Sequence, residues 1–545
     1  MASTASDAPT RDLDAVVVGA GFSGLYMLHH LRDVLGLSAR VYEVADGVGG
    51  TWYWNRYPGA RCDSESYYYS YSFSEELQQE WVWSSKYPEQ PEILRYLEHV
   101  ADRFDLRRDI RLSTRVTRAV FRDDSDDWEI HTDRGDVVTA QFFVSAVGCL
   151  SAANVPALPG IEHFAGEWYH TGAWPREPVD FSGKRVGLIG TGSTGIQVTP
   201  VVAAQARHLT VFQRTPNYSV PARNFALTHE QMSEIKSQYP EIRRKARESF
   251  AGFPYDPSNQ SAMDVTPEER QATYERLWAE EGGFKFIYGS YIDLLFNKDS
   301  NDTASEFIRG KIRQMVKDPS VAERLVPTDY PYGTKRPPID TDYYRAFNRD
   351  NVTLVDLRET PITEVTPGGL RTTRAEYDLD TLVFATGFDA MTGSLLRIDV
   401  RGRDGYELRK KWEDGPLTYL GMQVAGFPNM FVVTGPGSPS VLTNMPLAIE
   451  QHVEWIGECI SYVRQRGLTR VEATEEAEAA WVDQVRRIAE ATLFPLANSW
   501  YVGANIPGKS RVFMPYVGGF VHYRRHCEDV AANGYEGFAF SSRAS

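Results

Sequence analysis

Two glycine-rich turns, each placed between an apolar strand and a segment of helical period, constrain this fold most strongly. One lies in LDAVVVGAGFSGLYMLHHL and the other in GKRVGLIGTGSTGIQVTPVVA. Their glycines are Gly19, Gly21, Gly24, Gly190, Gly192 and Gly195. In such a motif the glycines permit the tight turn, a close backbone approach to a pyrophosphate, and helix–strand packing, while the helix amides face the anion. The sequence therefore predicts an α/β fold with two Rossmann-like dinucleotide-binding domains.

The residue at the end of the next strand indicates which dinucleotide each domain binds. Glu43 stands 19 residues after the first motif, where an acid receives ribose hydroxyls. Arg214 stands at the same offset after the second motif, and an arginine pairs with a 2′-phosphate that an acid would repel. Thr215 adds a hydroxyl. We predict FAD in the first domain and NADP(H) in the second; a turn without ligand and an ordinary surface arginine are the alternatives. Among the turn residues, Phe22 and Ser23 of the first motif are predicted to contact FAD. The predicted NADP(H) contacts of the second motif are Thr191, Ser193, Thr194 and Gln197.

Charged segments of helical period interrupt the second nucleotide unit, in HEQMSEIKSQYPEIRRKARESF and TASEFIRGKIRQMVKD. The segment YDLDTLVFATGFDA is predicted to be a strand that ends near a chain crossing between the domains. A hinge, a cofactor contact and a plain strand end are the alternatives for this end. The predicted domains are an FAD domain (1–145 and 386–545), an NADP domain (146–220 and 331–385) and a helical insertion in the NADP domain (221–330).

Composition excludes several classes of partner and location. The net charge of −15 over 545 residues disfavours nucleic acid and anionic lipid as partners. The chain has no run of 18 apolar residues and starts with a polar segment, so we expect no membrane span and no signal peptide. Four cysteines without a CxxC pair indicate reduced thiols in a cytoplasmic protein. We predict no metal site, and the oligomeric state stays open.

Two longer patterns make the resemblance specific. The stretch GGTWYWNRYPGARCD follows the first nucleotide motif, and the stretch GIEHFAGEWYHTGAWP precedes the second one. The latter stretch carries Phe164, Gly166, His170, Trp174 and Pro175. The chain thereby resembles the type I Baeyer–Villiger monooxygenases, and is most similar in GARCDSESYYYSYSF, GTKRP and GPGSPSVLTNM to those that act on phenylacetone and steroids. The resemblance implies an FAD enzyme that uses NADPH and O2 to convert ketones to esters or lactones, through a C4a-peroxyflavin and a tetrahedral adduct, with sulfoxidation as a side activity.

The resemblance also implies the catalytic residues. It places Arg336 of the loop PYGTKRPPID over the flavin and Lys335 at the 2′-phosphate, with Asp63 beside Arg336 and near the nicotinamide amide. A permanently charged guanidinium suits this place, because peroxide and tetrahedral oxyanion are both negative. A solvated basic pair and a surface acid are the alternatives. Arg61 and Cys62 are expected near the nicotinamide because they adjoin Asp63.

Further positions are carried over from the resemblance. Trp500 is expected to close over NADP, and exclusion of water would protect the oxygenated flavin; a core ring is the alternative. His170 is expected in a linker between the domains, with a conformational role. The segment 436–447 is expected to line the ketone pocket, or to be a turn-rich connector. The predicted pocket residues are Ser440, Val441 and Leu442, and the predicted FAD contacts are Gly50, Thr51, Trp52, Tyr69, Val116 and Met445.

Two other functions share these domains. A flavin monooxygenase that oxygenates nitrogen or sulfur would keep both nucleotide motifs, but the two long patterns and Arg336 favour the ketone enzyme. A non-enzymatic redox sensor would bind FAD without consuming O2 and NADPH. The identity of the ketone, whether aryl, cyclic or steroid, is left open by the sequence.

Overall fold

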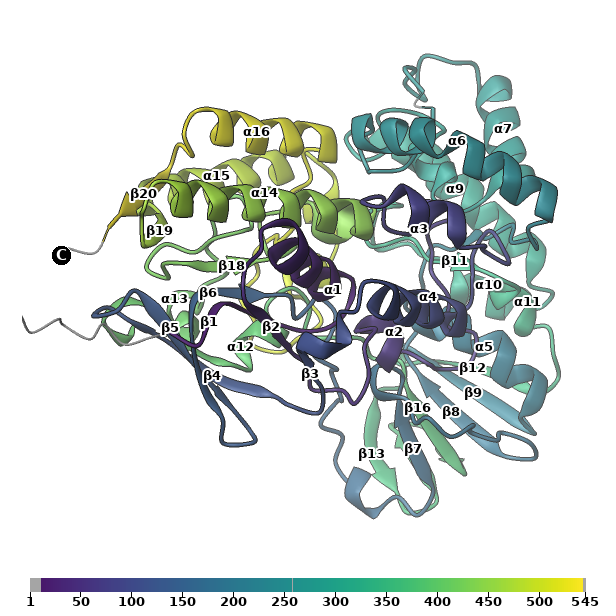
Figure 1. The fold of residues 1–545 in the computed structure, drawn as a ribbon. Coiled ribbons are helices and arrows are strands. Elements are labelled where there is room, and N and C mark those ends of the chain that lie inside the picture. Colours follow the sequence, from purple (N-terminus) through teal and green to yellow (C-terminus); the bar gives the residue numbers. More distant parts are fainter. Residues whose placement is uncertain (1–10, 257, 543–545) are drawn as a thin grey trace, which may run out of the picture.

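The first nucleotide motif lies in an eight-stranded sheet. The computed structural model describes residues 11–256 and 258–542. The sheet runs β17-β4-β5-β6-β1-β2-β3, and β18 pairs with β6 (Figure 1). Its strands are β1 (Leu13–Val18), β2 (Ala39–Tyr42), β3 (Ile110–Arg111), β4 (Val116–Arg122), β5 (Asp127–Thr132), β6 (Val137–Ser145), β17 (Asp399–Arg401) and β18 (Met430–Val432). Strands β1, β2 and β3 are parallel, whereas β4, β5 and the first half of β6 form an antiparallel meander.

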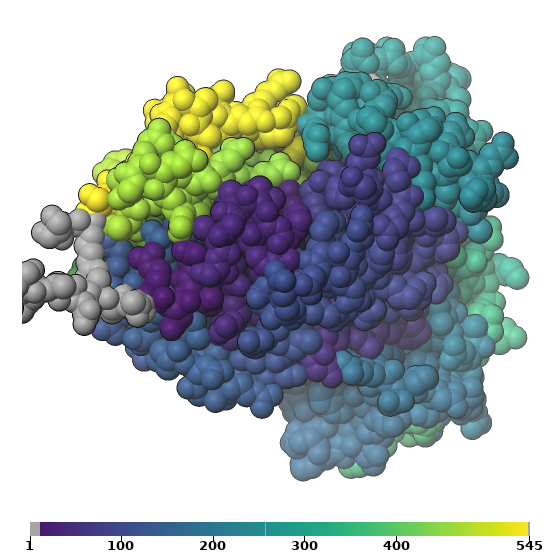
Figure 2. All heavy atoms as spheres, viewed as in Figure 1, coloured from purple at the N-terminus to yellow at the C-terminus, as the bar shows by residue number. Residues whose placement is uncertain are grey.

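Both faces of this sheet are covered. Ala15, Val16 and Val17 of β1 are fully buried, as expected for a parallel strand with structure on either side. One face packs against α1 (Phe22–His29), α4 (Gln90–Arg103), α14 (Met445–Gln465) and α16 (Phe520–Ala532), and the other faces the core of the meander. Figure 2 shows the purple N-terminal and yellow-green C-terminal segments meeting in one surface, so distant parts of the chain build this unit together.

The second nucleotide motif lies in a separate, fully parallel sheet of order β12-β9-β8-β16-β7 (Figure 1). Its strands are β7 (Glu167–His170), β8 (Arg185–Ile189), β9 (His208–Gln213), β12 (Val352–Asp356) and β16 (Thr381–Phe384), and α5 (Ser193–Gln205) follows β8. The expected linker position of His170 is therefore wrong. His170 pairs with Phe384 as the last residue of edge strand β7, because four residues of this segment extend the sheet.

Along the chain, helices occupy most of the segment between strands β9 and β12 of the second sheet. They are α6 (His229–Glu248), α7 (Pro267–Arg276), α8 (Lys285–Tyr288), α9 (Lys298–Met315) and α10 (Pro319–Leu325). Buried side chains of α7, α8, α9 and α10 join one hydrophobic cluster with Leu188 and Val211 of the sheet, whereas Met232 of α6 packs in the core of the first sheet, so the insertion is not a separate core. The predicted α/β fold with two Rossmann-like sheets and a helical insertion is confirmed. The exact domain boundaries stay a prediction.

The remaining elements are short or connect these units. They are α2 (Thr51–Trp54), α3 (Glu75–Glu80), α11 (Tyr343–Ala346), α12 (Gly393–Leu396), α13 (Leu408–Lys411), α15 (Glu475–Glu490), β10 (Val220–Pro221), β11 (Ile339–Asp340), β13 (Ile362–Thr366), β14 (Gly369–Thr372), β15 (Glu376–Asp378), β19 (Arg470–Ala473) and β20 (Phe538–Ser541). Among the described residues, no helix combines the length and the apolar character needed to cross a membrane. All four cysteines are buried and unpaired.

Candidate active site

The turn between β1 and α1 leaves room for a ligand where its glycines require it. Gly19 has φ +106°, and a Cβ added to Gly24 would lie 1.7 Å from the Gly19 carbonyl oxygen, so this glycine lets the helix pack on the strand. A Cβ on Gly50 would lie 2.8 Å from the Cα of Gly21. No described side chain caps α1. Two facing glycines and free helix amides fit a pyrophosphate passing between the two loops.

Glu43 is held rigidly at the end of β2. Its side chain is buried and accepts hydrogen bonds from the amides of Ala20 (2.7 Å) and Ala45 (2.8 Å). Burial raises the pKa of this carboxyl above its usual value, against these hydrogen bonds. Each carboxylate oxygen retains a further lone pair. The position beside the glycine turn and this remaining capacity fit the ribose hydroxyls of FAD.

The second turn repeats this design. Gly190 has φ +112°, and a Cβ added there would lie 2.4 Å from the Ala385 carbonyl oxygen. A Cβ on Gly192, in contrast, would meet no described atom within 4 Å. Helix α5 starts after Gly192 without a described side-chain cap, at Ser193 and Thr194. The Thr191 hydroxyl donates to the Thr215 carbonyl (2.9 Å) and ties the turn to the end of β9. The open space above Gly192 fits a second dinucleotide.

Two cations converge beside this turn. Arg214 is exposed just after β9, and Lys335 approaches it from the PYGTKRPPID loop. The ammonium of Lys335 lies 4.3 Å from the centre of the Tyr330 ring. Burial and the charge of Arg214 lower the pKa of Lys335 to about 8. The two cations repel each other, and a dianionic 2′-phosphate between them would offset this repulsion.

Asp63 and Arg336 form the centre of the site. Arg336 donates from Nε to Asp63 Oδ2 and from Nη2 to Oδ1, both at 2.7 Å, and from Nη1 to the Val441 carbonyl at 2.6 Å. Its guanidinium carbon lies 4.8 Å from the centre of the Phe284 ring. Burial alone would lower the pKa of Arg336, but the Asp63 carboxylate outweighs this effect and raises it. Arg336 is therefore a fixed, permanent cation that is only about one-fifth exposed (22%).

The stretch from Gly49 to Asp63 joins the two nucleotide sites. Tyr57 donates to Gln197 Oε1 of α5 (2.8 Å), and Gln197 Nε2 donates to the Arg61 carbonyl (3.1 Å). Gln197 thus holds this stretch against the second nucleotide helix. The Arg61 guanidinium donates to Glu89 (2.9 Å). Cys62 is buried, and this burial raises the pKa of its thiol.

The other predicted FAD contacts lie in different parts of the first unit. The indole Nε1 of Trp52 donates to the Tyr69 hydroxyl (3.2 Å), and Trp52 and Thr51 belong to α2. Met445 begins α14, and Val116 begins β4 with its side chain in the meander core. The side chain of Val116 therefore packs in the core of the sheet.

The predicted ketone-pocket segment reaches Arg336 directly. Val441 accepts the hydrogen bond from Arg336, and Ser440 beside it adopts φ +43°. Leu442 lines an apolar crevice together with Tyr288 of the insertion. Burial raises the pKa of Tyr288 to about 12, against the nearby charge of Arg336. Sequence reasoning missed Phe284 and Tyr288, although the aromatic run GGFKFIYGS was a visible signal.

The Trp500 loop is anchored on the segment that follows β16. Trp500 packs on Tyr501 in a short 3₁₀ turn, with ring centres 4.3 Å apart. Further along, Asn505 donates to the Phe388 carbonyl (2.7 Å), and Lys509 donates to Asp389 Oδ1 (2.6 Å) and to the Ala390 carbonyl (2.8 Å).

The fingerprint histidine lies behind the same segment. The His170 ring lies edge-on to Phe388, with ring centres 6.2 Å apart, and His170 Nδ1 accepts from the Gly172 amide (3.0 Å). Burial lowers the pKa of His170. Trp174 is buried, and Phe164 packs on a separate small core. The buried imidazole therefore lies against the segment that anchors the Trp500 loop.

Comparison with known proteins agrees with this geometry. A family model described as flavin-binding monooxygenase-like matches residues 14–224. The chain is 48% identical to a Baeyer–Villiger monooxygenase of Pseudooceanicola batsensis (96% of this chain, 95% of that protein) and 46% identical to a phenazine N-monooxygenase of Lysobacter antibioticus (98% of each). An oxidised steroid monooxygenase bound to NADP superposes with a TM-score of 0.93 at 54% identity, over 97% of this chain and 99% of that one. The chain therefore belongs to the flavin-binding monooxygenases, as a member of their Baeyer–Villiger type.

Proposed function

We propose that this chain binds FAD and NADPH and uses O2 to convert a ketone into an ester or lactone. The observation that carries the proposal is the fixed guanidinium of Arg336, which Asp63 and the Val441 carbonyl hold through hydrogen bonds. The bound flavin would supply the activation of O2. The protein would supply position, charge and exclusion of water.

Arg336 would stabilise negative charge that develops on oxygen at this point. Its cation needs no reorganisation during the reaction, because Asp63 fixes the plane of the guanidinium through two parallel hydrogen bonds. Asp63 accepts these two hydrogen bonds through both of its carboxylate oxygens. We therefore assign Arg336 as the stabiliser of the oxyanion and Asp63 as the residue that orients it.

The ketone would enter beside Val441 and Leu442. Phe284, Tyr288 and Leu442 surround this point with aromatic and aliphatic surface, which suits the apolar part of a ketone. Lys335 and Arg214 would hold the 2′-phosphate, and the Trp500 loop, anchored through Lys509, would cover the cofactor.

The domain boundaries, the cytoplasmic location and a sulfoxidation side activity are part of this proposal.

A second candidate is N-oxygenation of a heteroaromatic compound, because a relative with 46% identity over nearly the whole chain is a phenazine N-monooxygenase. NADPH consumption by the purified flavoprotein should be measured with aryl, cyclic and steroid ketones and, in parallel, with phenazines. Mass spectrometry and NMR then distinguish an ester from an N-oxide. Ester formation with at least one ketone class supports the first function; N-oxide as the sole oxygenated product would replace it with the second.

A further inference from the structure

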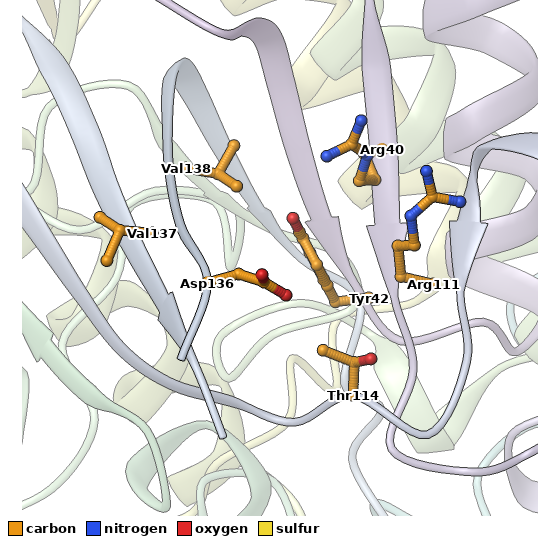
Figure 3. Close-up of a pocket in the computed structure, with 7 residues that line it drawn as sticks. All are labelled: Arg40, Tyr42, Arg111, Thr114, Asp136, Val137 and Val138. Atoms are coloured by element: carbon orange, nitrogen blue, oxygen red, sulfur yellow. The ribbon is translucent and has the colours of Figure 1, made fainter. Parts of the chain in front are cut away.

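A cavity of about 230 Å³ lies on the first sheet (Figure 3), and neither Asp63 nor Arg336 is among the residues that line it. Arg40 and Tyr42 of β2 and Arg111 of β3 form one side of it, and Asp136 with Val137 and Val138 at the start of β6 forms the other. Thr114 lies at the end between the two sides. None of these residues belongs to the nucleotide sites described above.

The strand register forces the two arginines onto one face. Tyr42 pairs with Arg111 across β2 and β3, and Arg40 precedes Tyr42 by two residues. Because side chains alternate along a strand, Arg40, Tyr42 and Arg111 project to the same side. Two neighbouring cations on one sheet face are unfavourable unless an anion lies between them.

Neither guanidinium is in direct contact with a carboxylate of the described residues. Within the described chain, the guanidinium groups of Arg40 and Arg111 make no hydrogen bond and no ion pair, although the protein carries 73 acidic residues against 58 lysines and arginines. Asp12 is close enough to Arg40 to interact with its charge, but its Oδ2 is engaged by the amide (2.8 Å) and hydroxyl (2.9 Å) of Thr139.

Some neighbouring arginines behave differently. Arg32 binds Asp33 and Asp109, and Arg108 contacts Asp105 and Asp109. Arg115, which adjoins the lining residue Thr114, also makes no side-chain hydrogen bond and no ion pair within the part of the chain that the structure describes.

The opposite side selects what the rest of the ligand must carry. The Asp136 carboxylate faces the cavity without contacting either arginine (Figure 3). A ligand that spans the cavity therefore needs an anion at one end and hydrogen-bond donors at the other, with Val137 and Val138 beside it. We propose that this cavity binds a small phosphate ester that bears hydroxyl groups: the phosphate between Arg40 and Arg111, near the Tyr42 hydroxyl, and the hydroxyls at Asp136.

The test uses the FAD-loaded protein with saturating NADP+, so that Arg214 and Lys335 are already occupied. Titration calorimetry with inorganic phosphate and with ribose 5-phosphate should show one site, with the ester at least about threefold tighter. Arg40→Gln combined with Arg111→Gln should weaken both ligands at least about tenfold. Asp136→Asn should remove the advantage of the ester and leave inorganic phosphate unchanged.

The matched control is Arg107→Gln combined with Arg108→Gln, which removes the same charge from exposed, paired arginines nearby. No binding by the wild-type protein, or equal losses in the control, would overturn the proposal. Loss of FAD from the Arg40/Arg111 variant would assign the cavity to the flavin site and overturn it as well. Hydrogen exchange of wild-type residues 39–42 and 110–111 should slow with ribose 5-phosphate; unchanged exchange would contradict the proposed place without relying on any variant.

Discussion

Raising the pH from 7 to 9 is expected to weaken NADP+ binding about tenfold, because Lys335 loses its proton in this interval. The pKa of Lys335 is lowered to about 8 by burial and by Arg214, which lies on the other side of the proposed 2′-phosphate site. A bound phosphate dianion would favour the charged ammonium and raise that pKa again. Binding above pH 8 therefore requires proton uptake, and the affinity falls as the pH rises.

The magnitude follows from the protonated fraction of the free protein. With a pKa of about 8, roughly nine-tenths of Lys335 is charged at pH 7 and roughly one-tenth at pH 9. The dissociation constant for NADP+ should rise in proportion, which corresponds to about 1.4 kcal/mol. A lysine with its ordinary pKa above 10 would show almost no change over the same interval.

Titration of the flavin absorbance with NADP+ at constant ionic strength between pH 7 and 9 measures this dependence. NAD+ is the first control, because it lacks the 2′-phosphate and should bind weakly and with little pH dependence. The variant Lys335→Arg is the second, because arginine keeps its charge and should bind NADP+ equally at both pH values. A steep pH dependence in Lys335→Arg, or none in the wild type, would refute the assignment of Lys335 to the phosphate.

Three further predictions concern the centre, the loop and the turn. Arg336→Ala should lower ester formation at least about 10²-fold, measured as product by gas chromatography, while NADP+ binding persists; wild-type rates would remove Arg336 from the mechanism. Lys509→Ala should release the anchor at Asp389, so that a larger share of the consumed NADPH appears as hydrogen peroxide in a peroxidase-coupled assay; an unchanged share would contradict the covering role of the loop. Gly190→Ala should lower the free energy of unfolding by about 1–2 kcal/mol in urea titrations, because φ is +112° and the new Cβ meets a carbonyl. Gly192→Ala should leave the free energy of unfolding unchanged and weaken NADP+ binding, because its Cβ enters open space. A larger loss of stability in Gly192→Ala than in Gly190→Ala would contradict this account of the turn.

Features that depend on neighbours in the sequence were predictable. Gly19 and Gly190 adopt positive φ in the turns, and Gly24 and Gly195 pack their helices against them, because backbone sterics within a few residues decide these conformations. The identity of the family followed from two long patterns of fixed spacing. The place of His170 did not, since pairing of β7 with β16 depends on a strand more than 200 residues away.

The catalytic centre shows where tertiary structure decides. Residue types and their spacing predicted the two dinucleotide turns, the positions of Glu43 and Arg214 after them, and the importance of Asp63 and Arg336. Only the fold brings Asp63 and Arg336 together across 273 residues and sets Val441 against the same guanidinium. It alone reveals Phe284 beneath Arg336 and two unpaired arginines on one face of β2 and β3. The physical reason is that such contacts depend on how distant segments pack, which no local spacing encodes.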